Sequence, residues 1–244
     1  QNTLPWETPW RVIIIGENPG TIVESNLTFH LAQENQIGDI SWVKPGISSW
    51  NWWSDHSGGR KYRSLKDYID FSAEMGWPYS LVDADWHVMQ GGSLEDLAEY
   101  AKTKNVGLFI WYNSGGPHTK VMDAGPRDLM FDRDIRRKEM KRISDLGIKG
   151  IKVDFFQGDK QGTINLYVDI IKDAADFQLM VNTHGSTIPR GWDRTYPNLI
   201  TMEAVRGAEL YSSASYPPMA VWQNTILPFT RNVIGSMDYT PVTF

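Results

Sequence analysis

The chain has 244 residues, a formal net charge of −5, no cysteine and no run of Lys and Arg. This composition excludes disulfides and thiolate chemistry, and it argues against a nucleic-acid or anionic-membrane surface, because phosphate binding needs clustered positive charge. No apolar stretch approaches the roughly 20 residues that cross a bilayer. We therefore expect one domain that acts on a neutral partner.

Residues 1–47 differ in pattern from the rest of the chain. Trp10 to Gly16 (WRVIIIG) predicts a strong strand, but no crossover helix follows it. We interpret 1–47 as a lead-in or linker from a missing upstream domain. The end after Asp238-Tyr239-Thr240-Pro241 is abrupt, which suggests a piece of a longer protein.

From residue 48 to 244, apolar β-rich runs alternate with helical periodicity, which is typical of parallel strands covered by helices. The predicted class is α/β, as a TIM-type (β/α)8 barrel that is incomplete at its C-terminal end. The predicted strands are 48–54, 78–85, 106–113, 148–156, 179–184 and 199–205, and 226–242 should hold a seventh and part of an eighth. The predicted helices are 64–75, one opened by a capping box of Ser93 and Asp96, 134–146 and 163–175.

The fourth predicted strand carries a lysine and an aspartate on one face. Because residues two apart point the same way, Ile151, Val153 and Phe155 should meet the helices, while Lys152 and Asp154 point into the barrel. They lie near the C-terminal end of the strand, where active sites of this fold collect. A buried lysine holds a neighbouring carboxylate ionised, as a nucleophile requires. The competing interpretation is a plain interior ion pair.

The second predicted strand repeats this pattern, with Leu81, Asp83 and Asp85 on one face. Two inward carboxylates at a strand end suit the binding of adjacent sugar hydroxyls. The same spacing also fits metal ligands or helix-capping acids, and spacing alone leaves these alternatives open.

The fifth and sixth predicted strands add Asn182, His184 and Glu203 to the same end of the barrel, which we call its mouth. The next loop carries Glu209. Tryptophan rings suit the apolar faces of sugars, although a single Trp is more often core. Those expected near the mouth are Trp52, Trp53 and Trp111. Glycoside hydrolysis usually requires two carboxyl groups, one on each side of the bond that is cleaved. Asp154 is one candidate, and the residues alone do not decide whether Glu203 or Glu209 is the other.

Two other classes compete with a glycosidase. A barrel hydrolase with a catalytic transition metal usually needs several histidine ligands, but the five histidines here include no H-x-H or H-E-x-x-H arrangement. A sugar-binding module without catalysis is the other class.

Several motifs together resemble glycoside hydrolase family 97. They are WRVII at 10–14, WVKPG at 42–46, WNWW at 50–53, IKGIKVDFF at 148–156, and RTYPNLITMEAVRG at 194–207 followed by Ala208-Glu209. The resemblance implies a catalytic barrel between an N-terminal β-sandwich and a small C-terminal β-domain of the same parent protein. It also implies calcium (Ca2+) at the active site and a periplasmic or otherwise exported bacterial protein.

The resemblance also points to one branch of that family. Its inverting α-glucosidase members carry a glutamate directly after the histidine of the fifth strand and lack the fourth-strand aspartate. Here Gly185 follows His184, and Asp154 is present, as in the retaining α-galactosidases. By the same resemblance Glu209 is the acid/base and Glu203 a calcium ligand, with another ligand from the upstream domain.

The expected substrate is an α-galactoside or a related oligosaccharide. The residues expected to contact it are Lys152, Asp83, Asp85, Trp53, Trp111, His184 and Asn182. An α-glucosidase of the same family and a non-catalytic carbohydrate-binding fragment are the alternatives.

Overall fold

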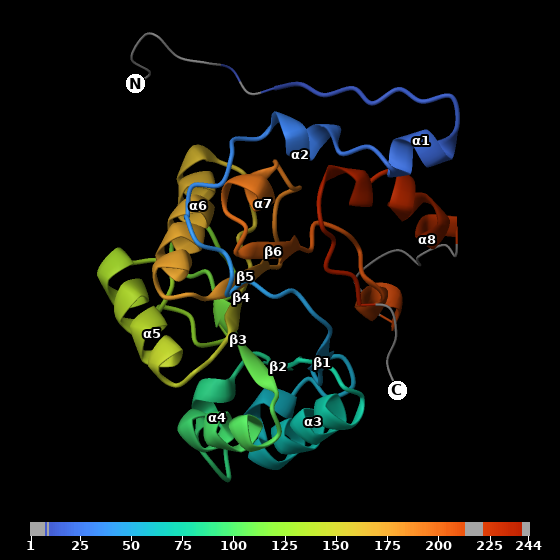
Figure 1. The fold of residues 1–244 in the computed structure, drawn as a ribbon. Helices are drawn as coiled ribbons and strands as arrows, with labels where there is room; N and C mark the ends of the chain where they lie inside the picture. The colour runs from blue at the N-terminus through green and yellow to red at the C-terminus, as the bar shows by residue number, and fades with distance from the viewer. Residues whose placement is uncertain (1–7, 9, 213–221, 241–244) are drawn as a thin grey trace.

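The computed structural model describes residue 8, residues 10–212 and residues 222–240. Its centre is one curled sheet of six parallel strands whose spatial order is their chain order (Figure 1). The strands are β1 (Ser48–Trp50), β2 (Tyr79–Val82), β3 (Gly107–Asn113), β4 (Gly150–Asp154), β5 (Met180–Thr183) and β6 (Leu199–Met202). The α/β class is therefore confirmed, and the sheet forms the curled half of a barrel.

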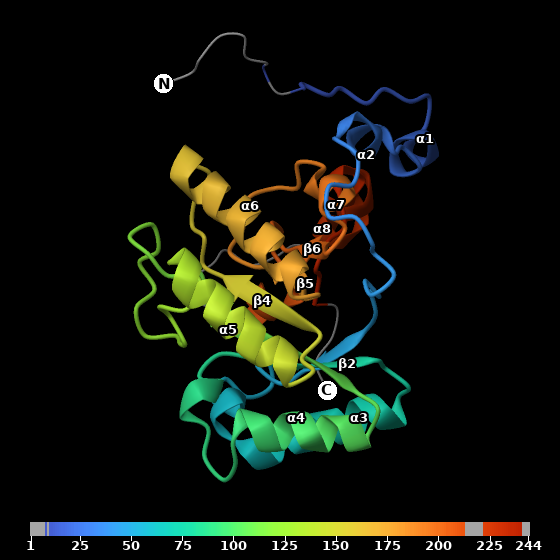
Figure 2. The same cartoon turned by 60° about the vertical axis from the view of Figure 1, so that its left-hand side comes forward.

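Helices on the outer face of the sheet connect the strands. They are α3 (Tyr62–Glu74), α4 (Leu94–Thr103), α5 (Arg133–Asp145), α6 (Gln161–Asp176) and α7 (Trp192–Thr195). Figure 2 shows α5 and α6 side by side across β4. The capping box that opens α4 is confirmed: Ser93 Oγ accepts from Asp96 N at 3.1 Å, and Asp96 Oδ2 accepts from Ser93 N at 3.0 Å. None of the described helices is long and apolar enough to cross a membrane.

Strand alternation sorts the apolar side chains into two layers. Alternate residues of β3, such as Ile110, pack outward in the main core under the helices, whereas Phe109 faces inward. The inner layer is closed by Trp42 and Val43, which pack with Phe109 and its neighbours. Gly150 makes room for this layer, because a Cβ there would lie 2.2 Å from Phe109 Cε1. The barrel interior therefore has an apolar floor below its polar end.

The predicted strand from Trp10 to Gly16 is wrong. Residues 10–16 have no regular secondary structure, and the side chains of Trp10 and Ile15 are 74% and 86% exposed. A strand needs a neighbour that takes its backbone hydrogen bonds, and no described strand pairs with this segment.

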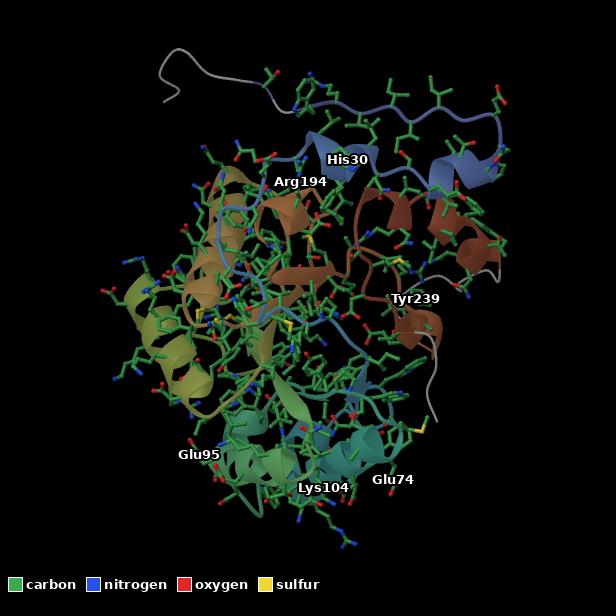
Figure 3. The ribbon with its side chains drawn as sticks, in the orientation of Figure 1. His30, Glu74, Glu95, Lys104, Arg194 and Tyr239 are labelled. Atoms are coloured by element: carbon green, nitrogen blue, oxygen red, sulfur yellow. The ribbon has the colours of Figure 1, made fainter. Side chains whose placement is uncertain are left out.

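The rest of the N-terminal segment is attached to the barrel. Its two short helices, α1 (Pro19–Val23) and α2 (Leu27–Leu31), lie against the chain near residues 227–234. Arg194 donates to the carbonyls of Phe29, His30 and Ala32, and Figure 3 shows His30 and Arg194 next to each other.

The predicted seventh and eighth strands in 226–242 are also largely wrong. The described part of this stretch and the residues just before it form α8 (Trp222–Ile226), η4 (Leu227–Phe229) and η5 (Asn232–Ile234). A single parallel bridge between Met202 and Met237 is what represents the seventh strand. Residues 241–242 lie outside the described residues.

The outer helices are joined by a buried ion cluster, which gives a test of the fold. Arg136 is 1% exposed and donates to Asp173 Oδ2 from Nε at 2.9 Å and from Nη2 at 2.6 Å. We expect Asp173→Ala to lower the free energy of unfolding in urea by about 3–5 kcal/mol, because it leaves a buried charge unpaired. Asp176→Ala, at a side chain 59% exposed, is the control and should cost at most about 1 kcal/mol. Equal losses for the two variants would contradict this account.

Candidate active site

Asp154 ends β4 on the inner face of the sheet. Its Oδ2 accepts from Trp111 Nε1 at 3.1 Å, and its Oδ1 accepts from the backbone N–H of Phe155 at 2.6 Å. Phe155 has φ of 66°, so the strand stops at Asp154 and the chain turns. The expectation that Phe155 faces the helices is wrong: its ring meets the Trp111 ring edge-on, and Phe156 enters the core instead.

Lys152 and Asp83 form a buried ion pair next to Asp154. Lys152 Nζ lies 2.9 Å from Asp83 Oδ2, and both side chains are 3% exposed. Trp50 Nε1 donates to the same oxygen at 2.6 Å, and Lys152 Nζ sits 4.6 Å from the Trp50 ring centroid. Burial alone would lower the pKa of Lys152, but attraction to Asp83 and Asp154 outweighs it and raises that pKa. Lys152 therefore stays charged.

His184 and Asn182, which lie at the end of β5, share a carboxylate from the C-terminal segment. Asp238 Oδ2 lies 2.5 Å from His184 Nε2 and accepts from Asn182 Nδ2 at 2.6 Å. Burial opposes a charged imidazole, but Asp238 and Glu203 outweigh burial and raise the pKa of His184 to about 9. Glu203 Oε1 lies 3.6 Å from His184 Nδ1, and Glu203 Oε2 accepts from Gly185 N at 2.7 Å.

The two carboxyl groups expected to act on substrate, those of Asp154 and Glu209, are both affected by the charges of Lys152 and His184. Burial is the main cause that raises the pKa of Asp154, and attraction to His184 and Lys152 opposes it. Burial also raises the pKa of Glu209, which lies on η3 (Ala208–Ser212); Lys152 and His184 lower it, and repulsion by Glu203 and Asp154 adds to the rise. Both carboxyls thus experience the same two cations.

Most predicted site residues converge on this cluster. Contacts or charge interactions link Asp154, Lys152, Asp83, Trp111, Asn182, His184, Glu203 and Glu209. Trp111, which was expected to contact substrate, is 1% exposed and donates its indole N–H to Asp154.

Asp85 does not join Asp83, and the prediction that they share one strand face is wrong. β2 ends at Val82, and Asp85 has φ of 69°, which turns its side chain to another direction. Arg60 donates to Asp85 Oδ2 from Nη2 at 2.7 Å, and Gly125 N donates to Oδ1 at 3.1 Å.

Trp53 lies in the turn after β1, half-buried, since that strand ends at Trp50 rather than at residue 54. Within the WNWW motif it is Trp50 that reaches the cluster, through Asp83. Sequence reasoning missed both Trp50 and Asp238. The alternation that marks Asp83 could have identified Trp50 on the neighbouring strand, but no strand pattern marks Asp238.

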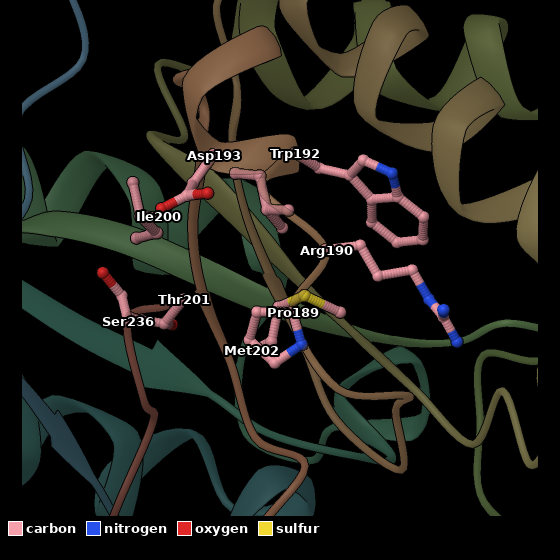
Figure 4. Close-up of a pocket in the computed structure, with 9 residues that line it drawn as sticks. Pro189, Arg190, Trp192, Asp193, Ile200, Thr201, Met202 and Ser236 are labelled. Carbon is pink, nitrogen blue, oxygen red and sulfur yellow. The ribbon is translucent and has the colours of Figure 1, made fainter. Parts of the chain in front are cut away.

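Two cavities lie outside this cluster. Figure 4 shows a shallow one beside β6, lined by Thr201, Met202 and Ser236 and by the loop that leads into α7. The other is lined by Arg60, Asp85 and their neighbours. Neither of these two cavities is lined by Asp154, Glu203 or Glu209.

Comparisons with known proteins identify the family of this chain. The family model of Glycoside hydrolase 97 matches residues 42–205. A "Probable retaining alpha-galactosidase" from Streptomyces bingchenggensis is 34% identical, and a "Retaining alpha-galactosidase" from Bacteroides thetaiotaomicron is 31% identical; each alignment covers 97% of this chain and 36% of the relative.

Two solved structures are similar to this chain in both sequence and fold. A beta-arabinopyranosidase is 38% identical, with a TM-score of 0.80 over 90% of this chain and 35% of that one. A Glycoside Hydrolase Family 97 enzyme from Pseudoalteromonas sp. strain K8, solved in complex with panose, is 25% identical with a TM-score of 0.77 over 94% and 40%.

The chain spans about a third of the length of the curated relatives it matches. The family match covers 42–205, which includes β1 to β6 and every predicted site residue except Glu209. The chain therefore belongs to glycoside hydrolase family 97.

Proposed function

We propose that the protein hydrolyses terminal α-galactosides with retention of anomeric configuration, with Asp154 as nucleophile and Glu209 as acid/base. The observation that carries this proposal is a buried carboxylate at the end of β4 with two cations, Lys152 and His184, in its field. The names of the two curated relatives support the same activity.

In the first step Asp154 attacks the anomeric carbon while Glu209 gives its proton to the departing glycosidic oxygen. A covalent glycosyl-enzyme forms on Asp154, and the leaving alcohol departs. In the second step Glu209, now a carboxylate, removes a proton from water, which attacks the same carbon and releases Asp154. Retention requires the two carboxyl groups to lie about 5 to 5.5 Å apart.

The charges around the two carboxyls suit these opposite roles. Burial raises the pKa of Glu209, which favours the protonated form that an acid needs at the start. Asp154 must be ionised although burial raises its pKa as well. His184, Lys152 and the Trp111 indole N–H each oppose that effect, and they are the groups that keep the nucleophile charged.

A β-arabinopyranosidase is a second candidate function, favoured by the 38% identity to a structure of that name. β-L-Arabinopyranosides share the ring stereochemistry of α-D-galactosides and lack only the exocyclic hydroxymethyl group. The same site is therefore expected to accept either sugar, and hydrolysis of both substrates should be measured side by side. An α-glucoside, with its equatorial 4-hydroxyl, is the third.

We propose further that calcium binds near Glu203. Carboxylate oxygens are the ligands that a hard cation prefers, and Glu203 is 17% exposed at the mouth. Over residues 10–212 and 222–240, no group of three acidic or histidine side chains is arranged to hold a metal. The proposal is that Glu203 supplies one ligand of a set that includes a group from another domain. When bound, the ion would supply positive charge for a sugar hydroxyl and the acid carboxylate.

We also propose that this chain is part of a longer, exported protein, in which a complete (β/α)8 barrel is flanked by β-domains. The substrate contacts proposed are Asp83, Lys152, Asn182, His184 and Trp53. Asp85, which is held by Arg60 and Gly125, and the buried Trp111, which donates to Asp154, are left out of this set. Support for flanking domains comes from the 36% coverage of the relatives.

The nucleophile assignment is tested by product stereochemistry. With p-nitrophenyl α-galactoside, NMR of the first-formed sugar should show the α anomer. Asp154→Asn should lose at least about 1,000-fold in kcat, because no covalent intermediate forms. Azide added to Asp154→Gly should restore turnover and give the β-galactosyl azide. Hydrolysis that persists in Asp154→Asn would make the assignment wrong.

The role of Trp111 is tested by pH dependence. Trp111→Phe keeps the ring and removes the N–H donor to Asp154, so the pKa of Asp154 rises further. Because the ionised form is active, the acidic limb of kcat/KM should move to higher pH, and kcat/KM should fall about ten- to a hundredfold. Trp222→Phe, at a side chain 63% exposed, should leave the profile unchanged. A limb that stays in place or moves to lower pH would contradict this role.

Metal removal tests the calcium proposal. Thorough chelation should lower kcat/KM for p-nitrophenyl α-galactoside, and Ca2+ in excess should restore it, whereas Mg2+ should restore less because it demands a tighter octahedral shell. Glu203→Gln should weaken Ca2+ binding in isothermal titration. Full activity after calcium removal would defeat the proposal.

A further inference from the structure

The seventh position of the sheet carries a carboxylate held in place by backbone pairing. Met202 N donates to Ser236 O, and Asp238 N donates to Met202 O at 3.1 Å. Arg231 is 6% exposed and clamps this segment, because its Nη2 donates to both Met202 O and Ser236 O. Asp238 thus reaches the mouth from a strand-like segment beside β6.

One oxygen of Asp238 holds two side chains of the neighbouring strand end. Oδ2 accepts from Asn182 Nδ2 at 2.6 Å and lies 2.5 Å from His184 Nε2. A carboxylate oxygen accepts, so the imidazole donates from Nε2 to Asp238, while its Nδ1 faces Glu203 Oε1 at 3.6 Å. The imidazole is therefore fixed between two carboxylates.

His184 is in turn next to the proposed nucleophile. Its backbone N–H donates to Val153 O at 2.9 Å, which places it beside the residue that precedes Asp154. The side chain is 6% exposed, so the ring has little freedom unless its partner is removed. The chain of contacts runs from Asp238 through His184 to the end of β4.

We propose that Asp238 is a positioning residue for the reaction at Asp154, and that it acts by fixing the orientation of the His184 ring. The inference rests on the function proposed above. A carboxylate that accepts from a ring N–H fixes the orientation of a histidine; by analogy with the carboxylate partners of metal-bound histidines, we expect its loss to cost about 10- to 100-fold in activity.

Kinetics give the first test. With p-nitrophenyl α-galactoside, Asp238→Asn should lower kcat by about 10- to 100-fold with little change in KM. Asp238→Glu, which keeps the charge, should recover part of kcat. Asp128→Asn, at a surface side chain 82% exposed, is the matched control and should retain wild-type kcat. If Asp238→Asn fails to fold, Asp238→Ser takes its place.

NMR of the imidazole N–H protons gives the second test and needs no turnover. A downfield Nε2–H resonance of His184 should be present in the wild type and in Asp128→Asn, and absent in Asp238→Asn. If the wild type hydrolyses no glycoside but this resonance depends on Asp238, the activity assignment fails and the positioning contact stands. An unchanged resonance, or wild-type kcat in Asp238→Asn, would overturn the inference.

Discussion

The arrangement of the site depends on the buried ion pair between Lys152 and Asp83. Two side chains that are each 3% exposed must neutralise each other, since an unpaired charge at this depth costs several kcal/mol. Lys152 donates its hydrogen bond to Asp83. It therefore acts on Asp154 through its positive charge, and the two oxygens of Asp154 are left to other donors. At the end of β5, His184 is likewise paired with Asp238, and its charge also acts on Asp154. Asp154 thus lies between two compensated pairs.

Such a polar cluster inside a barrel requires a dry layer beneath it. Phe109 fills the space over Gly150, and the segment at Trp42 and Val43 closes the floor. Two residues further along the same strands, the inward side chains become Trp111 and Lys152. The period of two therefore stacks a polar layer on an apolar one, and the low dielectric below strengthens the charge interactions above.

Predictions from the sequence were confirmed where a single physical rule determines the local structure. Period two predicts that Lys152 and Asp154 share an inward face, and the capping box predicts where α4 begins. The predictions failed where the chain leaves regular geometry: Phe155 and Asp85 both have positive φ, so alternation no longer describes them. Asp238 was out of reach, because one bridge and the Arg231 clamp place it rather than a strand pattern. The choice of Glu209 over Glu203 came from resemblance, not from spacing.

Gly185 lies against the end of β4, and the residue at this position bears on the proposed stereochemistry. Gly185 has φ of 50°, and a Cβ there would lie 2.9 Å from Phe155 N and 3.1 Å from Asp154 Oδ1. A side chain after His184 would therefore press on the carboxylate of β4 or on the turn that follows it. The two shortest contacts of such a Cβ would be with the backbone of Phe155, and the positive φ at position 185 also favours glycine. In this backbone, glycine after His184 therefore fits the turn that follows β4 and leaves room for the carboxylate of Asp154.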